Sequence, residues 1–208
     1  AVQWYRKAAE QGNAEAQFNL GVMYAEGRGV RQDDAEAVRW YRQAAEQGDA
    51  QAQFNLGLMY ENGLGVAQND KQAVAWYQKA AQQGFALAQF NLGNMYYNGT
   101  GVAQDYQQAF AWFQKAANQG FALAQNNLGM MYDYGLGVPQ DYQLAIVWFE
   151  KAANQGDVKA QYNLGSMYEN GQGVAQNYQQ AAKWYQKAAT QGYAMAQNNL
   201  GAIYANGQ

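Results

Sequence analysis

Cysteine and histidine are absent from this sequence of 208 residues, and proline occurs once, as Pro139. Without cysteine there is no disulfide framework, and the redox compartment cannot be read from the sequence. The absence of both residue types also removes the commonest general base, the thiol nucleophile and the usual zinc ligands. We therefore predict a protein that is not an enzyme, with no catalytic residue, no metal site and no cofactor. A single proline is compatible with long helices.

Charge is also sparse. Thirteen basic and 16 acidic residues give a net charge of −3 and a pI near 4.9, which argues against a nucleic-acid or anionic-membrane partner. No apolar run approaches the length of a membrane span, so we expect no membrane insertion. The sequence begins at Ala1 without Met, which leaves a removed leader open, and cytoplasmic, periplasmic and secreted locations are all compatible with it.

The residues that are present repeat every 36 positions. All 23 glycines fall into four positions of this period, represented by Gly12, Gly21, Gly27 and Gly29. A period of this length with helical spacing inside it predicts a solenoid of helix pairs. We expect one array over 1–208, with half units at 1–12 and 193–208 and full units at 13–48, 49–84, 85–120, 121–156 and 157–192. The same step links Trp4, Trp40, Trp76, Trp112, Trp148 and Trp184, and also Leu20, Leu56, Leu92, Leu128, Leu164 and Leu200.

Each unit contains two helical patterns. Ala16, Leu20 and Tyr24 mark one apolar face, and Trp40 and Ala44 mark another. Asn62-Gly63 resembles a hairpin turn, but no alternating strand pattern flanks it, so we interpret the glycine as a helix stop. Side-chain caps are expected at the start of the second helix, where an acceptor is followed three residues later by a Glu or Gln in four of five cases. These pairs are Asp33/Glu36, Asn69/Gln72, Asp105/Gln108, Asp141/Leu144 and Asn177/Gln180.

The repeated string is specific. Ala-x-Ala-Gln-x-Asn-Leu-Gly-x-Met-Tyr, then Gly-x-Gly-Val, then Ala-x-x-Trp-Tyr-x-Lys-Ala-Ala, resembles the Sel-one-like repeat family, whose α/α units are related to tetratricopeptide repeats. The resemblance covers essentially the whole chain. It implies an all-α, right-handed superhelical solenoid whose first helices line the concave face. It also implies a scaffold or adaptor role, often in bacterial envelope, secretion, stress or host-interaction settings. The cysteine pairs of some bacterial relatives are absent here.

Most of the repeated residues are expected to serve the fold. We assign the tryptophans to the core, and Gly21 to a close approach by a neighbouring helix. Gln17 and its repeats should make contacts between units, and Gln32 and its repeats should bond backbone within the loop. The Gly-x-Gly loops follow a helix and lack the Lys-Ser/Thr of phosphate-binding turns. The carboxylates of Glu61, Asp133 and Glu169 are expected on a solvated face.

The candidate site is the part of the first helix that varies between units. These positions lie within an arc of about 100° on a helical wheel, opposite the packed side, and they are unusually apolar in the middle units. Two interpretations are open for them, a binding stripe, which we favour, and burial of neighbouring units against each other. The asparagines at the lip of the arc either grip a peptide backbone or bond between helices. The partner-binding candidates are Phe54, Asn55, Leu58, Leu87, Phe90, Asn91, Tyr97, Leu123, Asn127, Met130, Tyr134 and Tyr162.

Four functions follow from these observations. The first is a non-enzymatic scaffold that binds a protein or peptide segment in its concave groove. The second is a glycan-binding groove, in which Tyr97, Tyr134 and Tyr162 would stack on sugars. The third is end-to-end self-association, because no polar cap covers the end helices, unless the sequence is a piece of a longer array. The strong resemblance of the units to each other also leaves open a consensus-designed array without a natural partner. An enzyme is the least favoured, and a close-set pair of carboxylates in the folded groove would be needed to revive it.

Overall fold

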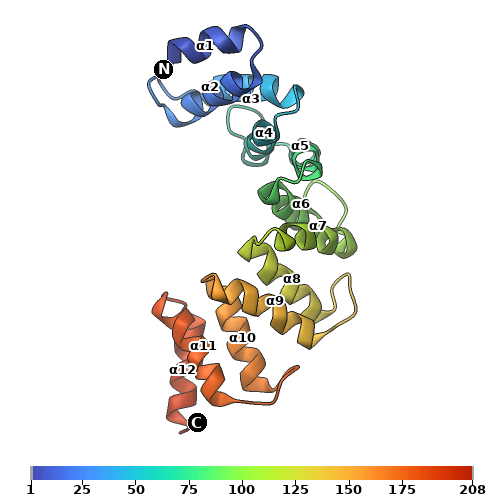
Figure 1. Cartoon of the computed structure of the whole chain (residues 1–208), viewed down its shortest axis with the longest axis vertical. Coiled ribbons are helices and arrows are strands. Elements are labelled where there is room, and N and C mark those ends of the chain that lie inside the picture. The colour runs from blue at the N-terminus through green and yellow to red at the C-terminus, as the bar shows by residue number, and fades with distance from the viewer. Residues whose placement is uncertain (1, 208) are drawn as a thin grey trace. The chain divides into compact units, whose positions relative to one another are not determined.

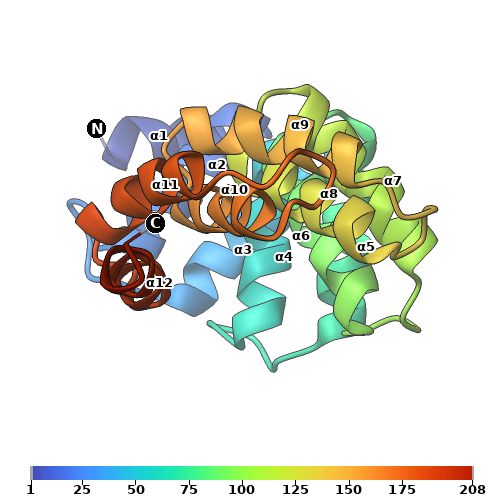
Figure 2. The same ribbon diagram turned by 90° about the horizontal axis from the view of Figure 1, so that it is seen from below.

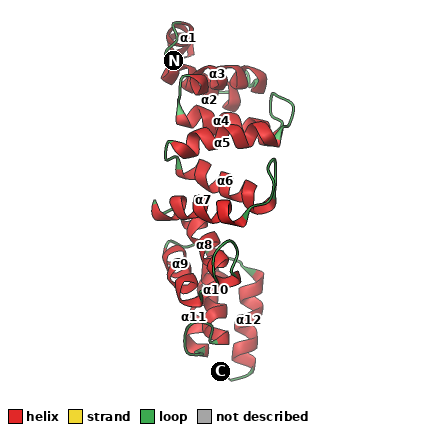
Figure 3. Ribbon diagram, turned by 90° about the vertical axis from the view of Figure 1, so that its right-hand side faces the viewer, coloured by secondary structure: helices red, strands yellow, loops and turns green. Residues whose placement is uncertain are grey.

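The computed structural model describes residues 2–207, and this part of the chain consists of helices and loops without a strand (Figure 3). It forms two compact units that divide between Asp105 and Tyr106. The first unit contains α1 (Val2–Glu10), α2 (Ala14–Glu26), α3 (Asp34–Glu46), α4 (Ala50–Asn62), α5 (Asp70–Gln82) and α6 (Ala86–Asn98) (Figure 1). The second contains α7 (Tyr106–Asn118), α8 (Ala122–Tyr134), α9 (Tyr142–Asn154), α10 (Val158–Asn170), α11 (Tyr178–Thr190) and α12 (Ala194–Ala205).

Within each unit, consecutive helices pack as pairs, which confirms the predicted all-helical fold of helix pairs. The Gly-x-Gly-Val loops join α2 to α3 and α4 to α5 in the first unit, and α8 to α9 and α10 to α11 in the second. The even-numbered helices are the first helices of the repeat, and the odd-numbered helices are the second helices. Figure 2 looks at the second unit from the end that holds α11 and α12.

The helices begin and end at the capping residues that the sequence predicts. The Asp33 side chain accepts from the Glu36 N–H at 3.0 Å, and Asn69, Asp141 and Asn177 cap their helices in the same way. Helix α4 ends at Asn62, and Gly63 then takes φ 68°, the left-handed conformation that stops a helix. The helix-stop interpretation of Asn62-Gly63 is therefore confirmed.

Glycine inside the first helix lets a ring from the second helix lie on its backbone. A Cβ on Gly21 would lie 2.6 Å from Cδ1 of Tyr41, and a Cβ on Gly129 would lie 2.7 Å from Cδ1 of Phe149. No real side chain tolerates such a contact, so the bare backbone is needed for this packing. The predicted close approach is confirmed, and it fixes the position of the ring relative to the first helix.

A ladder of glutamines ties the first helices α2 and α4 of the first unit, and α8 and α10 of the second, to the helices on both sides. Gln53 donates to the Ala45 carbonyl at 3.0 Å and accepts from Gln83 at 2.8 Å. Gln161 makes the same two bonds, to Ala153 at 3.2 Å and from Gln191 at 2.8 Å. These side chains are buried, so the bonds satisfy polar atoms that would otherwise be costly. The predicted role of Gln17 and its repeats in contacts between units is confirmed.

The glutamines after the loop donate hydrogen bonds to a different segment of backbone from the one predicted. Gln104, Gln140 and Gln176 donate to the carbonyls of Tyr97, Asp133 and Glu169 at 2.8, 2.6 and 2.9 Å. These carbonyls belong to the last turn of the preceding helix, where the helix leaves acceptors unpaired. The acceptor is thus backbone, as predicted, but it lies in the helix and not within the loop.

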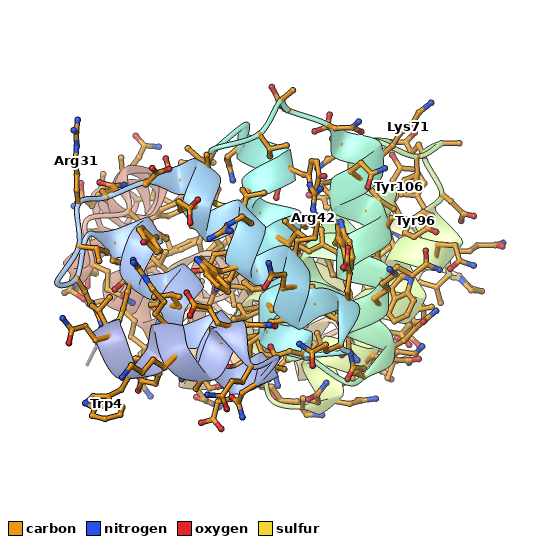
Figure 4. All side chains as sticks on the ribbon, turned by 90° about the horizontal axis from the view of Figure 1, so that it is seen from above. Trp4, Arg31, Arg42, Lys71, Tyr96 and Tyr106 are labelled. Carbon is orange, nitrogen blue, oxygen red and sulfur yellow. The ribbon has the colours of Figure 1, made fainter. Side chains whose placement is uncertain are left out.

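The tryptophans divide by position. Trp40, Trp76 and Trp112 are buried, and Trp148 and Trp184 are half-buried. Trp4 is 74% exposed on α1, and its ring projects away from the other helices of the first unit (Figure 4). The core assignment is therefore wrong for Trp4, because no described helix precedes α1 to cover it.

A basic residue lies over every tryptophan ring, at 3.9 Å from the centroid for Lys79 on Trp76 and for Lys187 on Trp184. The expectations from the sequence did not include this cation–π ladder, although five of the six pairs have a Trp-x-x-Lys spacing that places both side chains on one helix face. Over Trp40 the cation is Arg39, its neighbour in the sequence.

Candidate functional site: the face of the first helices

The predicted partner-binding residues lie on the first helices α4, α6, α8 and α10. Within each unit, we call the exposed and half-buried side of its first helices the first-helix face. Leu87, Leu123 and Tyr134 are exposed on it, at 41, 47 and 67%. The other candidates are half-buried, so part of this surface is already used inside the fold. They are Phe54, Asn55, Leu58, Phe90, Asn91, Tyr97, Asn127, Met130 and Tyr162.

Two of the aromatic candidates pack against the next repeat. The ring centroid of Phe54 lies 5.2 Å from that of Phe85, and Tyr162 lies 5.3 Å from Tyr193. Phe85 and Tyr193 occupy the N-cap position of α6 and α12, where they make no side-chain cap bond. The aromatic ring therefore replaces a polar cap by a contact between repeats. For Phe54 and Tyr162, the geometry therefore agrees with the second interpretation, in which neighbouring repeats bury these side chains against each other.

The asparagines bond to buried tyrosine hydroxyls of the preceding second helix. Asn55 is hydrogen-bonded to Tyr41, and Asn91 to Tyr77. Asn199 Nδ2 donates to the Tyr185 hydroxyl at 3.2 Å. Burial raises the pKa of Tyr41 to about 12, against the lowering effect of the Asn55 bond. The inter-helix interpretation of the asparagine ladder is realised in these pairs.

Two carboxylates assigned to a solvated face have an internal partner. The Tyr77 hydroxyl donates to Glu61, and the Tyr185 hydroxyl donates to Glu169 at 2.5 Å. Burial, reinforced by the carboxylate, raises the pKa of both phenols. The solvated assignment is therefore wrong for Glu61 and Glu169, because the ring that lies on the helix glycine places its hydroxyl beside the last turn of the first helix.

Asp133 holds the same position of the repeat but has a different neighbour. The residue that corresponds to Tyr77 and Tyr185 is Phe149, which carries no hydroxyl. The Asp133 carboxylate makes no hydrogen bond or ion pair with any residue of the range 2–207, and burial raises its pKa above the ordinary value. Its oxygens are accessible to solvent, because Trp40 Nε1 is the one fully buried polar side-chain atom without a partner in the range 2–207, so the carboxylate faces open space and not a protein donor.

A cavity opens beside this carboxylate in the second unit. The Asp133 cavity has a volume of about 350 Å³ and is lined by residues of α8, α9, α10 and α12 and of the loops beside them. Asn163 donates from Nδ2 to Asn126 at 3.1 Å, and its Oδ1 has no donor among the described residues. The lining therefore combines unused acceptors with aromatic and apolar surface. Its principal residues are Asp133, Tyr134, Tyr142, Tyr162, Asn163 and Met195.

The first unit contains a much smaller cavity at the equivalent position of the repeat. The Glu61 cavity is lined by Glu61, Asn91 and Met95, each of them 72 positions before Asp133, Asn163 and Met167. Its volume is only about 70 Å³, and Glu61 is held there by the Tyr77 hydroxyl. The two cavities thus arise from one element of the repeat, and only the one in the second unit is roomy.

Two further kinds of feature, metal-binding groups and membrane-spanning helices, are absent from the described part of the chain. Residues 2–207 hold no group of three or more Asp and Glu side chains placed to bind a metal ion. The helices among them are too short and too polar to cross a membrane.

The sequence of these helix pairs matches a known repeat. The sequence model of the Sel1 repeat matches residues 1–13, 14–49, 50–85, 86–121, 122–157, 158–193 and 194–208. The chain belongs to the Sel1 repeat family. Proteins built from Sel1 repeats are generally scaffolds for protein interactions and are generally not catalytic. A comparison with curated proteins found no match.

Solved structures of bacterial Sel1 repeat proteins share the fold. A protective antigen present in uropathogenic Escherichia coli strains, which displays an SLR fold, is 43% identical with a TM-score of 0.96. The match covers all of this chain but 44% of the E. coli protein, so this chain spans less than half of its length. A Sel1 repeat protein from Oxalobacter formigenes is 39% identical with a TM-score of 0.86, over 95% of this chain and 79% of that protein. The immunity protein Pa5087 from Pseudomonas aeruginosa is 28% identical with a TM-score of 0.53, over 88% of this chain and 67% of that protein.

Proposed function

We propose that this Sel1 repeat chain is a non-enzymatic scaffold that binds a protein or peptide segment on the first-helix face of its second unit. The observation that carries the proposal is the set of exposed apolar side chains on that face. Leu123, Tyr134 and Met195 of the second unit are 47, 67 and 54% exposed, and the last two lie beside the Asp133 cavity. Apolar side chains grouped around a cavity are typical of surfaces that bind another molecule.

The fold supports this use because the face is held rigid. The rings seated on Gly129 and Gly165 and the buried side chains of Gln125 and Gln161 hold α8 and α10 between their neighbours within the second unit. A surface that is ordered before binding loses little conformational entropy when a partner docks. The free energy gained by burying the exposed apolar side chains therefore goes into affinity, because little of it is offset by the entropy lost in ordering the protein.

The proposal is tested with a matched pair of double variants. Leu123→Glu/Tyr134→Glu changes the first-helix face, and Leu144→Glu/Val147→Glu changes two side chains on α9 that are 40 and 43% exposed. A random library of displayed 12-residue peptides is selected on the folded wild-type protein, and the affinity of the selected peptides is then measured for both variants.

We expect the face variant to weaken peptide binding by about tenfold or more, which corresponds to about 1.4 kcal/mol. The α9 variant should bind as the wild type does. Thermal unfolding checks that both variants keep the fold. Equal losses in the two variants, or no loss in the face variant, would place the binding surface elsewhere.

A further inference from the structure

The Asp133 cavity suggests what the bound segment carries. We propose that this cavity receives the cationic side chain of a lysine or arginine residue in the protein segment that docks on the first-helix face. The inference rests on the proposed function and adds to it the chemistry of one contact residue. It follows from an unpaired acceptor, an internal donor that is missing, and the composition of the walls.

The acceptor is the Asp133 carboxylate. It is half-buried at the last turn of α8, and no donor or cation among residues 2–207 reaches it. Removing water from a carboxylate disfavours its charged form, and burial accordingly raises the pKa of Asp133. A cation that enters the cavity supplies the missing charge and donor together, and charge-assisted hydrogen bonds of this kind are stronger than neutral ones.

The missing donor is explained by one residue of the repeat. In the pairs Tyr77–Glu61 and Tyr185–Glu169 the phenol binds the carboxylate from inside the fold. Phe149 takes the same seat, since its Cδ1 and Cε1 lie 2.7 Å from the place of a Cβ on Gly129. The ring is therefore in position but has no hydroxyl to offer. The carboxylate that is an internal acceptor in the other two repeats is left to an external donor here.

The walls suit a cation on a long apolar stem. Tyr134, Tyr142 and Tyr162 line the cavity, and aromatic faces attract Lys and Arg side chains within about 6 Å. Asn163 Oδ1 adds a second acceptor without a partner among the described residues, and Met195 adds apolar surface. The volume of about 350 Å³ is more than ten times the share of roughly 30 Å³ that one water takes in the liquid.

The cations of the second unit are placed elsewhere. Lys115, Lys151 and Lys187 lie over the rings of Trp112, Trp148 and Trp184 at 4.0, 4.0 and 3.9 Å. Lys159 and Lys183 are exposed and form no ion pair in the described range. No basic residue lines the cavity, so the site is open to a cation that another molecule brings.

The test is a titration with side-chain probes. Protein labelled with ¹³C at the aspartate carboxyls is titrated at constant ionic strength with N-acetyl-lysine methylamide, N-acetyl-arginine methylamide and the uncharged N-acetyl-norleucine methylamide. Asp133→Asn identifies the Asp133 resonance by its disappearance. We expect a saturable shift of this resonance with at least one cationic probe and none with the norleucine probe, and the responding probe tells lysine from arginine. A flat Asp133 resonance, or equal shifts with all three probes, would overturn the cation site.

A peptide experiment separates this inference from the proposed function. Selected peptides are remade with each lysine changed to norleucine and each arginine to citrulline. We expect one such change to weaken binding about tenfold in the wild type and hardly at all in Asp133→Asn. Peptides that bind without a critical cation would overturn the cation site and leave the proposed function standing. If no peptide binds while the probes still shift Asp133, the proposed function fails and the cation site stands by itself.

Discussion

The Glu61 and Asp133 cavities are two versions of one element of the repeat. Both lie beside the last turn of a first helix, and in both a ring from the second helix is seated on a helix glycine, Gly57 or Gly129. In the first unit the ring belongs to Tyr77, which binds Glu61, and the cavity holds about 70 Å³. In the second unit the ring is Phe149, and the cavity beside Asp133 holds about 350 Å³.

The difference shows how a repeat protein gains a site without changing its fold. The glycine fixes where the ring lies, and the terminal atom of the ring decides where the carboxylate finds its donor. A hydroxyl satisfies the carboxylate from inside, and its absence leaves the carboxylate to a ligand. The change from Glu to Asp also shortens the side chain by one methylene.

The largest expected effect tests whether the two rings are equivalent in the core. Tyr77→Ala and Phe149→Ala should each lower the free energy of unfolding by about 3–5 kcal/mol, because both rings are fully buried. Tyr134→Ala removes a ring that is 67% exposed and should change it by less than about 0.5 kcal/mol. Urea unfolding measures all three. A small loss in only one of the core variants would mean that the two rings are not seated alike.

An effect of intermediate size concerns the hydroxyl. Tyr77→Phe should lower the free energy of unfolding by about 1–3 kcal/mol, since it leaves the half-buried Glu61 without its donor. Tyr60→Phe is the matched control, because it removes a hydroxyl that accepts from Arg42 at 2.6 Å in an exposed bond. We expect that control to change stability by only a few tenths of a kcal/mol. Urea unfolding measures both variants, and equal losses would show that the internal Tyr77–Glu61 bond has no special weight.

The smallest effect is the pH dependence at Asp133. Burial raises the pKa of this carboxyl above 3.8 in the folded protein, so the folded state holds the proton more tightly than the unfolded state. The free energy of unfolding of the wild type should therefore rise, relative to Asp133→Asn, as the pH falls from 7 through the raised pKa toward 3.8. Urea unfolding at several pH values gives this difference, in which the other carboxyls cancel. A difference that is constant with pH, or that falls as the pH is lowered, would contradict the environment assigned to Asp133.

The sequence was sufficient for the fold because its signals are local and periodic. The spacing of Leu20 and Tyr24, the cap at Asp33 and the stop at Gly63 each act within one or two helical turns. Gly21 is also predictable as a close contact between helices, because a glycine that is costly inside a helix recurs in every unit. Gln17 is predictable as a contact between units, because it points away from the variable arc on the helical wheel. These predictions needed no knowledge of which helix faces which side chain.

The site was harder to predict because its contacts join residues far apart in sequence. Tyr77 and Glu61 are 16 positions apart on different helices, and the ring meets the carboxylate only after the helices pack. Phe54 was assigned to a binding stripe because the arc it lies on faces away from its own helix pair, whereas Phe85 from the next repeat covers it. The signal available was the joint variation of two positions, with Glu opposite Tyr at 61/77 and 169/185 and Asp opposite Phe at 133/149.

The most direct measurement uses a variant in which the Asp–Phe pair of positions 133 and 149 is replaced by the Glu–Tyr pair found at positions 61 and 77. The double variant Asp133→Glu/Phe149→Tyr restores the Glu–Tyr pair of residues 61 and 77 in the second unit, and its affinity for N-acetyl-lysine methylamide and N-acetyl-arginine methylamide is compared with that of the wild type by calorimetry. The internal hydroxyl should then satisfy the carboxylate, so we expect a folded protein that binds the responding probe at least about tenfold more weakly. Unchanged affinity in the folded double variant would contradict the claim that the residue at position 149 decides whether this carboxylate is available to a ligand.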